Sequence, residues 1–484
     1  MSTMNKVCSP YFDPEFDELP ERIFGPTCRV CIDNESLEDC TLVKVNSINK
    51  QGILLEVVKV LTDMNLTISK SYISSDAGWF MFVFHVKDEH GNKLTDQRVI
   101  NYIQQAIGTT REIPNSLTYV NNVIESEPAS EHTAIEMSGA DRPGLFSEIS
   151  AALADLQVNI VEAHAWTHNE RLACVAYITD QSTDSRIEDP HRLAKIEKHL
   201  ATVLGAANIS RTNHQEVKGA DLHVGEATTT CAERRLHQLM LSVEDFEGPS
   251  APTTSSSETP LGLDEDDDEG SKAIVSIESC NERGYSIVSI ECKDRQRLMF
   301  DVVCTITDMQ YLIFHGSTAS HGGYAMQEYF IRHIDGCTVN SEGEKEHVVK
   351  CLEAAIERRV CEGVRLELCA NNRLGLLSDI TRVLRENGLA VVRADVETQG
   401  EKAVNAFYVK DLSGNDVDAE FTEPKKKEKF IESVKKEMGP IDLAVKKEIT
   451  SSPSSPDHRP RFSVADMVKS HVDRLSNNFI PIKN

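Results

Sequence analysis

Four segments of the 484-residue chain repeat the same short polar turn, each followed by an apolar pattern with helical spacing. Each turn opens with Asp or Asn and continues with a basic residue. In all but the third segment, glycine stands three places after the opening residue, and in every segment an acidic residue lies four places beyond that position. The segments are NKQGILLEVVKVL from Asn49, DRPGLFSEISAAL from Asp141, DRQRLMFDVVCTI from Asp294 and NRLGLLSDITRVL from Asn372. Such self-similarity indicates one supersecondary unit used repeatedly.

The surroundings of each turn predict what that unit is. In the first copy a strand-like run, Thr41–Val45, precedes the turn, and two more, Ile68–Ser74 and Trp79–Val86, follow the helix before a second helical run at Asp96–Ile107. A closing strand is clearest in the second copy, at Asn208–Thr212. The order predicts an α+β fold of four ferredoxin-like βαββαβ modules, with antiparallel sheets and helices on one face. Because both faces of Trp79–Val86 are apolar, we expect this strand to be buried on both sides, as modules paired side by side would achieve.

The copies divide the chain into modules and connecting segments. We expect modules at 37–125, 130–215, 284–361 and 362–449, an acidic N-terminal arm at 1–36, a linker at 225–275 with a short helix and an acidic run, and a C-terminal tail at 450–484 with an amphipathic helix. The linker separates the second copy from the third and predicts two pairs of modules. The tail helix fits either docking on the protein's own domains or binding to a partner.

Composition excludes several classes of partner. The formal net charge of −26 repels nucleic acid and anionic membranes, so neither is an expected partner. No apolar stretch approaches the ~20 residues that span a bilayer. The 13 cysteines are scattered, and no apolar leader is present, which indicates a reducing compartment, the cytoplasm or the nucleus. Lys425–Lys427 fits the solvated face of a helix or a nuclear-import signal.

The turn itself suits two interpretations. The opening Asp or Asn fits an N-cap, and the acid that follows the glycine favours the positive end of the helix dipole, so the turn serves folding. Alternatively, free backbone N–H groups at the helix start attract a carboxylate, glycine permits close approach, and the Asp or Asn side chain accepts hydrogen bonds from an ammonium group. These elements together suit a free amino acid.

The sequence resembles a known family. The run Asp141–Leu153, followed by Val158–Ile160, resembles the ACT domain, a regulatory module that binds amino acids. Four copies, together with RVCIDN at Arg29–Asn34 and AERRLHQLM at Ala232–Met240, resemble the plant ACT domain repeat (ACR) family. The resemblance implies modules that pair within the chain or between copies of it, with amino-acid ligands at their interfaces near the first strand-to-helix turn.

The resemblance also implies ligand-binding residues. They are Asn49, Gly52, Asp141, Gly144, Asn159, Asn372 and Gly375. The second copy has the fullest set, because the first and fourth copies have Thr67 and Ala390 in place of Asn159. The third copy has Arg297 in place of glycine, and this side chain predicts a filled site.

The leading hypothesis is therefore a non-catalytic amino-acid sensor without a cofactor, acting on a protein partner or on its own assembly. A ligand-free interaction scaffold is the alternative. An enzyme has support only from the C-x-x-C of Cys28 and Cys31, which lacks further zinc ligands at suitable spacing. The aromatic strand at Trp79–Phe84 fits an RNA-recognition fold, but the acidic charge opposes that interpretation.

Overall fold

The computed structural model describes residues 28–48, 52–76, 79–109, 132–205, 216–220, 229–241, 273–359, 364–411, 424–438 and 442–447. Among them, no helix is both long and apolar enough to cross a membrane. The predicted strand at Asn208–Thr212, the acidic run and the C-terminal tail helix lie outside these residues.

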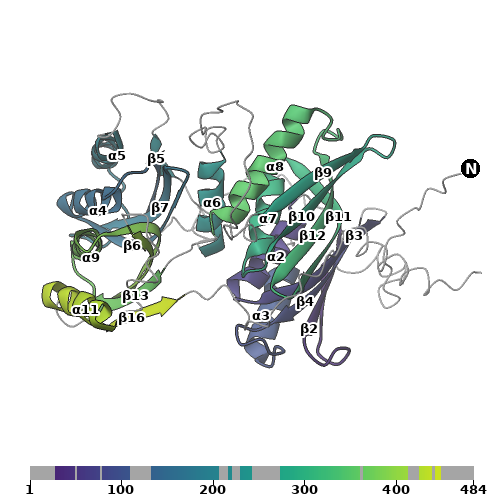
Figure 1. The fold of residues 1–484 in the computed structure, drawn as a ribbon, viewed down its shortest axis with the longest axis horizontal. Coiled ribbons are helices and arrows are strands. Elements are labelled where there is room, and N and C mark those ends of the chain that lie inside the picture. The colour runs from purple at the N-terminus through teal and green to yellow at the C-terminus, as the bar shows by residue number, and fades with distance from the viewer. Residues whose placement is uncertain are drawn as a thin grey trace, which may run out of the picture. The chain divides into compact units, whose positions relative to one another are not determined.

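The described residues form two compact units, each built on an eight-stranded antiparallel sheet (Figure 1). The first unit combines the first and third copies of the repeat (modules 1 and 3), and the second unit combines the second and fourth (modules 2 and 4). The predicted fold of paired ferredoxin-like modules is confirmed. The pairing alternates along the chain, however, instead of joining neighbours on each side of the linker.

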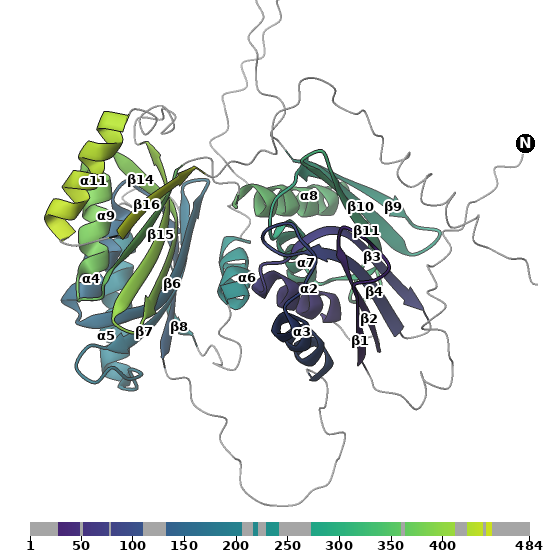
Figure 2. The same ribbon diagram turned by 90° about the horizontal axis from the view of Figure 1, so that it is seen from below.

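The first unit has its helices on one face of the sheet (Figure 2). Module 1 comprises β1 Cys28–Asp33, β2 Thr41–Ile48, α2 Ile53–Asp63, β3 Thr67–Asp76, β4 Trp79–Lys87 and α3 Gln97–Thr109. Module 3 comprises β9 Ile274–Cys280, β10 Tyr285–Lys293, α7 Leu298–Asp308, β11 Tyr311–His321, β12 Tyr324–His333 and α8 Glu342–Glu357.

The second unit has the same arrangement and one additional helix. Module 2 comprises β5 Thr133–Ala140, α4 Leu145–Asp155, β6 Val158–His168, β7 Arg171–Asp180, α5 Pro190–Gly205 and β8 Glu216–Ala220. Module 4 comprises β13 Val364–Asn371, α9 Leu376–Glu386, β14 Leu389–Gln399, β15 Lys402–Asp411, α11 Pro424–Met438 and β16 Asp442–Lys447. The additional helix is α6 Thr229–Met240.

The outer strand of each module comes from one of two places in the chain. In modules 2 and 4 it follows the second helix, and β8 and β16 pair with β5 and β13. In modules 1 and 3 it precedes the first strand, and β1 and β9 pair with β2 and β10. The free edge of the module's first strand accepts either segment, because both run antiparallel to it. The RVCIDN segment, which we expected in a terminal arm, therefore begins the first sheet.

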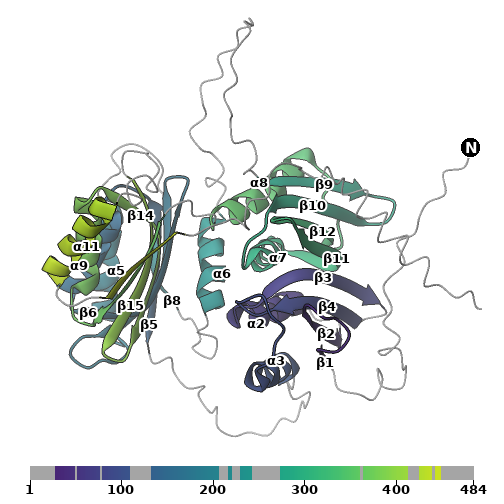
Figure 3. The same ribbon diagram turned by 60° about the horizontal axis from the view of Figure 1, so that its bottom comes forward.

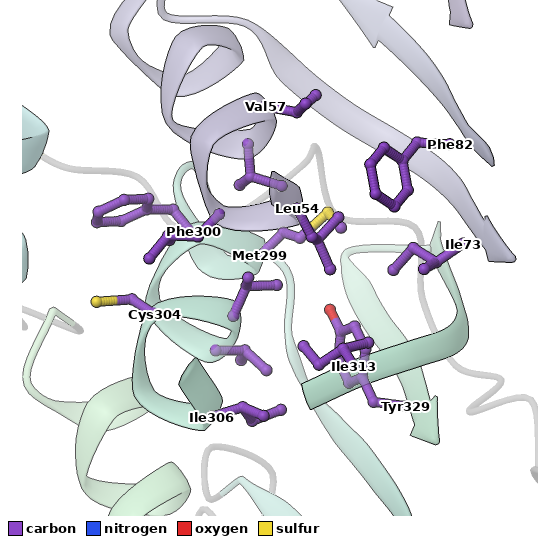
Figure 4. Close-up of a cluster of buried hydrophobic side chains, with 14 of the residues drawn as sticks. Leu54, Val57, Ile73, Phe82, Met299, Phe300, Cys304, Ile306, Ile313 and Tyr329 are labelled. Carbon is purple, nitrogen blue, oxygen red and sulfur yellow. The ribbon is translucent and has the colours of Figure 1, made fainter. Parts of the chain in front are cut away.

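Within the first unit, strands β3 and β11 join the two modules edge to edge (Figure 3). Gly316 of β11 lies opposite Ile73 of β3, where a Cβ atom would be 2.8 Å from the Glu328 carbonyl oxygen. The core continues across this junction, with Leu54, Phe82, Met299 and Tyr329 in one cluster (Figure 4). Paired sheets thus bury apolar surface that each module alone would expose.

The strand expected to be buried on both sides is buried mainly on one. On β4, Phe80, Phe82 and Phe84 face the helices and are at most 7 % exposed. On the opposite face Val83 is buried, but Trp79 and Met81 are only half-buried. Pairing occurs at the strand edges, so it does not cover that face.

In the second unit, β6 and β14 form the equivalent junction, and a charged cluster lies on it. His164 of β6 lies opposite Asp395 of β14, and its ring nitrogens are 2.8 Å from Asp395 and 2.7 Å from Glu162. Burial acts to lower the pKa of His164, but the hydrogen bonds to the two carboxylates outweigh it and raise the pKa to about 9. The Arg393 guanidinium lies 2.9 Å from Asp395. The cluster links the two modules through charge-assisted hydrogen bonds.

Helix α6 covers the second face of this sheet, opposite α4, α5, α9 and α11 (Figure 2). Its buried stripe, Ala232, Leu236 and Met240, packs on Trp166 and Val175. The predicted short helix in the linker is therefore an integral part of the second unit.

Buried charges also hold α6. Glu233 is fully buried and lies 2.8 Å from the Arg359 guanidinium, which stacks over Trp166 at 5.1 Å from the ring centroid. Arg235 lies 2.7 Å from Glu136 of β5. A helix held by paired buried charges is fixed in one register, because shifting it would leave those charges without partners.

The close approach of the Glu328 carbonyl oxygen to Gly316 can be tested by substitution. Gly316→Ala is expected to destabilise the first unit by about 1–3 kcal/mol, since the added methyl group meets backbone that must shift. Urea denaturation measures this, with Gly343→Ala at the start of α8 as control, because a Cβ there meets no atom within 4 Å. Equal effects of the two substitutions would contradict the close packing of Gly316 on β12.

His164 predicts a pH dependence of the second unit. Its pKa is raised in the folded state, so the stabilisation is complete below its unfolded value of 6.5 and is lost as pH rises through about 9. His164→Gln is expected to flatten the decline in unfolding free energy between pH 7 and 10, by at most about 3 kcal/mol. His168→Gln is the control, because burial lowers the pKa of His168 to about 4 and the residue stays neutral throughout. The same slope in both variants would refute the assignment.

Candidate functional site

The repeated turn has one backbone geometry in all four modules. Each first helix is preceded by a residue in the left-handed region, with φ of 81° at Gly52, 87° at Gly144, 64° at Arg297 and 78° at Gly375. These residues occupy the N-cap position, and none of the four caps has a side-chain hydrogen bond. The predicted N-cap role of the opening Asp or Asn is therefore wrong, because that residue lies three positions too early. The Asp141 carboxylate instead accepts a hydrogen bond from the Arg142 backbone N–H at 2.8 Å.

The basic residue of the turn pairs with the acid of the first helical turn. Arg142 binds Glu148, with Nη1 to Oε1 at 2.6 Å, and Arg295 and Arg373 bind Asp301 and Asp379 at 2.7 and 2.6 Å. Arg142 also donates to the Val203 carbonyl oxygen at the end of the second helix. This part of the repeat is structural, because it fastens the turn to both helices of its module.

In the second unit, each turn faces the neighbouring module across a pocket. The loop-2 pocket lies between the turn Asp141–Gly144 and residues 389–391 at the start of β14, with Thr381 and Arg385 of α9 at its side. Its volume is about 340 Å³. The loop-4 pocket lies between residues 372–375 and residues 158–160 at the start of β6, and its volume is about 40 Å³.

The predicted ligand-binding residues of one module do not all line the same pocket. Asp141 and Gly144 line the loop-2 pocket, whereas Asn159 of the same module lines the loop-4 pocket with Asn372 and Gly375. Each site therefore takes its turn from one module and its strand from the other, as edge-to-edge pairing dictates.

Two charged groups distinguish the loop-2 pocket. Burial raises the pKa of Asp141 to about 6, although the hydrogen bond from the Arg142 backbone N–H and the Arg142 charge oppose the shift. Arg385 reaches across from α9, with Cδ and Nη1 only 3.1 and 3.3 Å from where a Cβ of Gly144 would lie. Gly144 thus provides both the left-handed turn and the space for this arginine. Arg385 was not among the predicted site residues, because it lies in the last turn of α9, outside the turn motif of its own module.

The loop-4 pocket contains amides where the loop-2 pocket has charges. Asn372 is exposed at its mouth, and Asn159 Nδ2 lies 3.5 Å from Asp184. Asn405 of β15 is 2 % exposed and also lines this pocket. The one charged side chain that lines it, Arg373, is bound to Asp379 at 2.6 Å, so the pocket offers hydrogen bonding but no counterpart of the Asp141 and Arg385 charges.

The first unit differs again. Gly52 has the same left-handed turn geometry as Gly144, and a Cβ there would meet no atom within 4 Å, whereas Asn49 lies outside the described residues. In module 3, Arg297 extends across the junction, its Nη2 atom 3.4 Å from Asn65 just before β3 of module 1. A side chain thus reaches across the module 1 and module 3 junction from the glycine position of the turn.

The C-x-x-C segment lies on β1, where Cys28 is buried and Cys31 half-buried. Among the residues with defined positions, no group of three or more His, Cys, Asp or Glu side chains is arranged to hold a metal ion.

Comparison with known proteins identifies the family. Residues 36–114 match the family model of the ACR family N-terminal ACT domain, and residues 133–205 match that of the ACT domain. Residues 274–365 match the model of the ACR9-like, ACT-like domain. The chain is 58 % identical to ACT domain-containing protein ACR2 of Arabidopsis thaliana, over 99 % of this chain and 100 % of that protein. This chain belongs to the ACR family. ACT domain-containing protein ACR3 of the same plant is 50 % identical over 90 % of each chain.

The structure also gives physical roles to the two ACR-like segments outside the repeated turn. RVCIDN lies in and after β1, the outer strand of the first sheet, and AERRLHQLM forms most of α6. Both complete a sheet, one at its edge and the other on its second face.

The half-buried carboxylate of Asp141 predicts a stability cost in this ACR protein. Because its pKa is raised in the folded state, its ionisation lowers stability as pH rises from 3.8 through about 6. Asp141→Asn, which keeps the acceptor for the Arg142 N–H, is expected to stabilise the second unit by about 1–3 kcal/mol at pH 7.5 and by little below pH 4. Thermal unfolding across this pH range measures it. Asn372→Asp at the exposed equivalent position is the converse control, and an equal penalty there would contradict the role of burial.

Proposed function

We propose that this ACR protein is a non-catalytic regulatory sensor that binds a free amino acid at the junction of modules 2 and 4. The observation that carries the proposal is the loop-2 pocket of about 340 Å³, which lies between two modules and contains an acidic and a basic side chain. Small-molecule sites are characteristically concave and carry a few convergent polar groups.

The position between modules explains how binding would regulate. A ligand that touches the turn of module 2 and the strand of module 4 has different affinity for a tight and a loosened junction. Only such differential affinity shifts a conformational equilibrium. The change would then reach a protein partner, or the assembly of the protein itself, through the sheet that both modules share.

A ligand-free interaction scaffold is the second candidate function. It is favoured in the first unit by Arg297, which occupies the glycine position and reaches Asn65. By this proposal, modules 1 and 3 serve assembly while modules 2 and 4 sense.

The cytosol is the proposed location, with the nucleus as a second possibility. The scattered, odd-numbered cysteines support a reducing compartment. A fluorescent fusion of the whole chain tests this placement.

Substitution of Gly144 separates the sensor from the scaffold. Gly144→Leu is expected to abolish the thermal shift caused by an amino acid, because the side chain strains the turn at φ 87° and enters the space of Arg385. Isothermal titration with each standard amino acid identifies the ligand first. Gly91→Leu controls for backbone strain, because Gly91 has φ 80° and open space around it. If no amino acid gives heat or a thermal shift with the unmodified protein, the sensor proposal fails and the scaffold stands.

A further inference from the structure

We infer that, of the two turn pockets in the second unit, only the loop-2 pocket holds an amino acid, and that Arg385 of module 4 binds its α-carboxylate while Asp141 of module 2 binds its ammonium group. The inference rests on the proposed function and deepens it. It assigns one site and two charged contacts supplied by different modules.

The two pockets are related by the approximate twofold arrangement of modules 2 and 4. When the turns are aligned at Gly144 and Gly375, Asp141 of module 2 is equivalent to Asn372 of module 4. In the same alignment, Ala154 is equivalent to Arg385, and Asn159 to Ala390. The backbone geometry of the two turns is the same, with φ of 87° and 78° at the two glycines. Side-chain chemistry therefore decides which pocket binds a charged ligand.

Arg385 is available for a ligand. Among the residues that the structure describes, no hydrogen bond of its guanidinium is found, although its charge contributes to lowering the pKa of Glu148. Glu148 itself is held by Arg142 through both carboxylate oxygens. Arg385 lies over Gly144 at the start of α4, where free backbone N–H groups add positive potential. A carboxylate between them would meet a planar cation and the N-terminus of a helix.

Asp141 supplies the opposite charge. Its carboxylate accepts the Arg142 backbone N–H and retains further acceptor capacity. Glu148 does not compete for an ammonium group, because Arg142 already pairs with it. A carboxylate and a guanidinium in one pocket can pair with both charges of a zwitterion. A monocarboxylic acid or a simple amine would pair with only one of these two side chains.

The loop-4 pocket has a smaller volume and lacks the counterparts of Asp141 and Arg385; its one arginine, Arg373, is held by Asp379 at 2.6 Å. Asn372 and Ala154 replace the acid and the arginine. Its 40 Å³ accommodates about two or three water molecules. Because Arg373 is already paired, only neutral amides remain there, and they do not offset the cost of removing both charges of a zwitterion from water.

The assignment is tested by titrating the full chain with the amino acid that the isothermal titration series identifies, and with the α-amide of that amino acid. Arg385→Ala is expected to weaken binding of the amino acid about 10- to 100-fold, as for loss of a charged hydrogen bond. The same variant should abolish the preference for the amino acid over its amide, a readout that a purely structural role would not change. Asp141→Asn should weaken binding of both compounds, because both keep the ammonium group.

Matched controls lie on the same elements. Arg382→Ala removes another arginine of α9, one that pairs with Asp379 and Glu386, and Asn372→Ala alters the loop-4 pocket. Both should bind as the unmodified protein does, and circular dichroism verifies that all four variants fold. Binding that survives Arg385→Ala with its preference for the amino acid, or that is lost with Asn372→Ala, overturns this inference alone. If no amino acid binds the unmodified protein, the proposed function fails with it.

Discussion

Edge-to-edge pairing of antiparallel strands is the interaction on which the rest of the molecule depends. At the junction between β6 and β14, backbone hydrogen bonds join modules 2 and 4 into one sheet, and the pair formed by His164 and Asp395 adds charge to the same contact. In the first unit, β3 and β11 form the equivalent junction, and Gly316 of β11 leaves room for the Glu328 backbone of the neighbouring strand β12. An unpaired strand edge exposes N–H and C=O groups and invites association with other chains. Pairing within the chain satisfies those groups and creates the helix-to-helix contacts above the sheet.

The pairing also decides where the two pockets of the second unit lie. The turn of one module is brought opposite the second strand and first helix of its partner, so each site is shared between modules. The equivalent positions then diverge: charges occupy the loop-2 pocket, amides line the loop-4 pocket, and Arg297 reaches across the junction of modules 1 and 3. The four turns have similar backbones, but the side chains at a few equivalent positions differ, so the turns differ in chemistry.

Local features were predictable because they depend on neighbouring residues. The alternation of strand and helix patterns identified the modules, and Gly52, Gly144 and Gly375 marked the turns, where all three have positive φ. The N-cap role of Asp141 was predicted wrongly, since the same residue types serve caps and turns and only the backbone geometry separates them. The strand at Cys28–Asp33 was assigned to an arm, because six residues without a repeated partner give little periodicity.

By itself, the sequence determined the four modules, their α+β topology and the chemistry available at each turn, because these follow from residue spacing over short distances. The tertiary structure decided the rest. The sequence of a strand edge does not specify which other strand it pairs with, so the alternating pairing of modules is decided only when whole edges and helix faces come into contact. That pairing moved Asn159 to the opposite pocket and brought Arg385 over Gly144, 241 positions away in the chain. The site is thus a property of two modules in contact, and neither segment contains it alone.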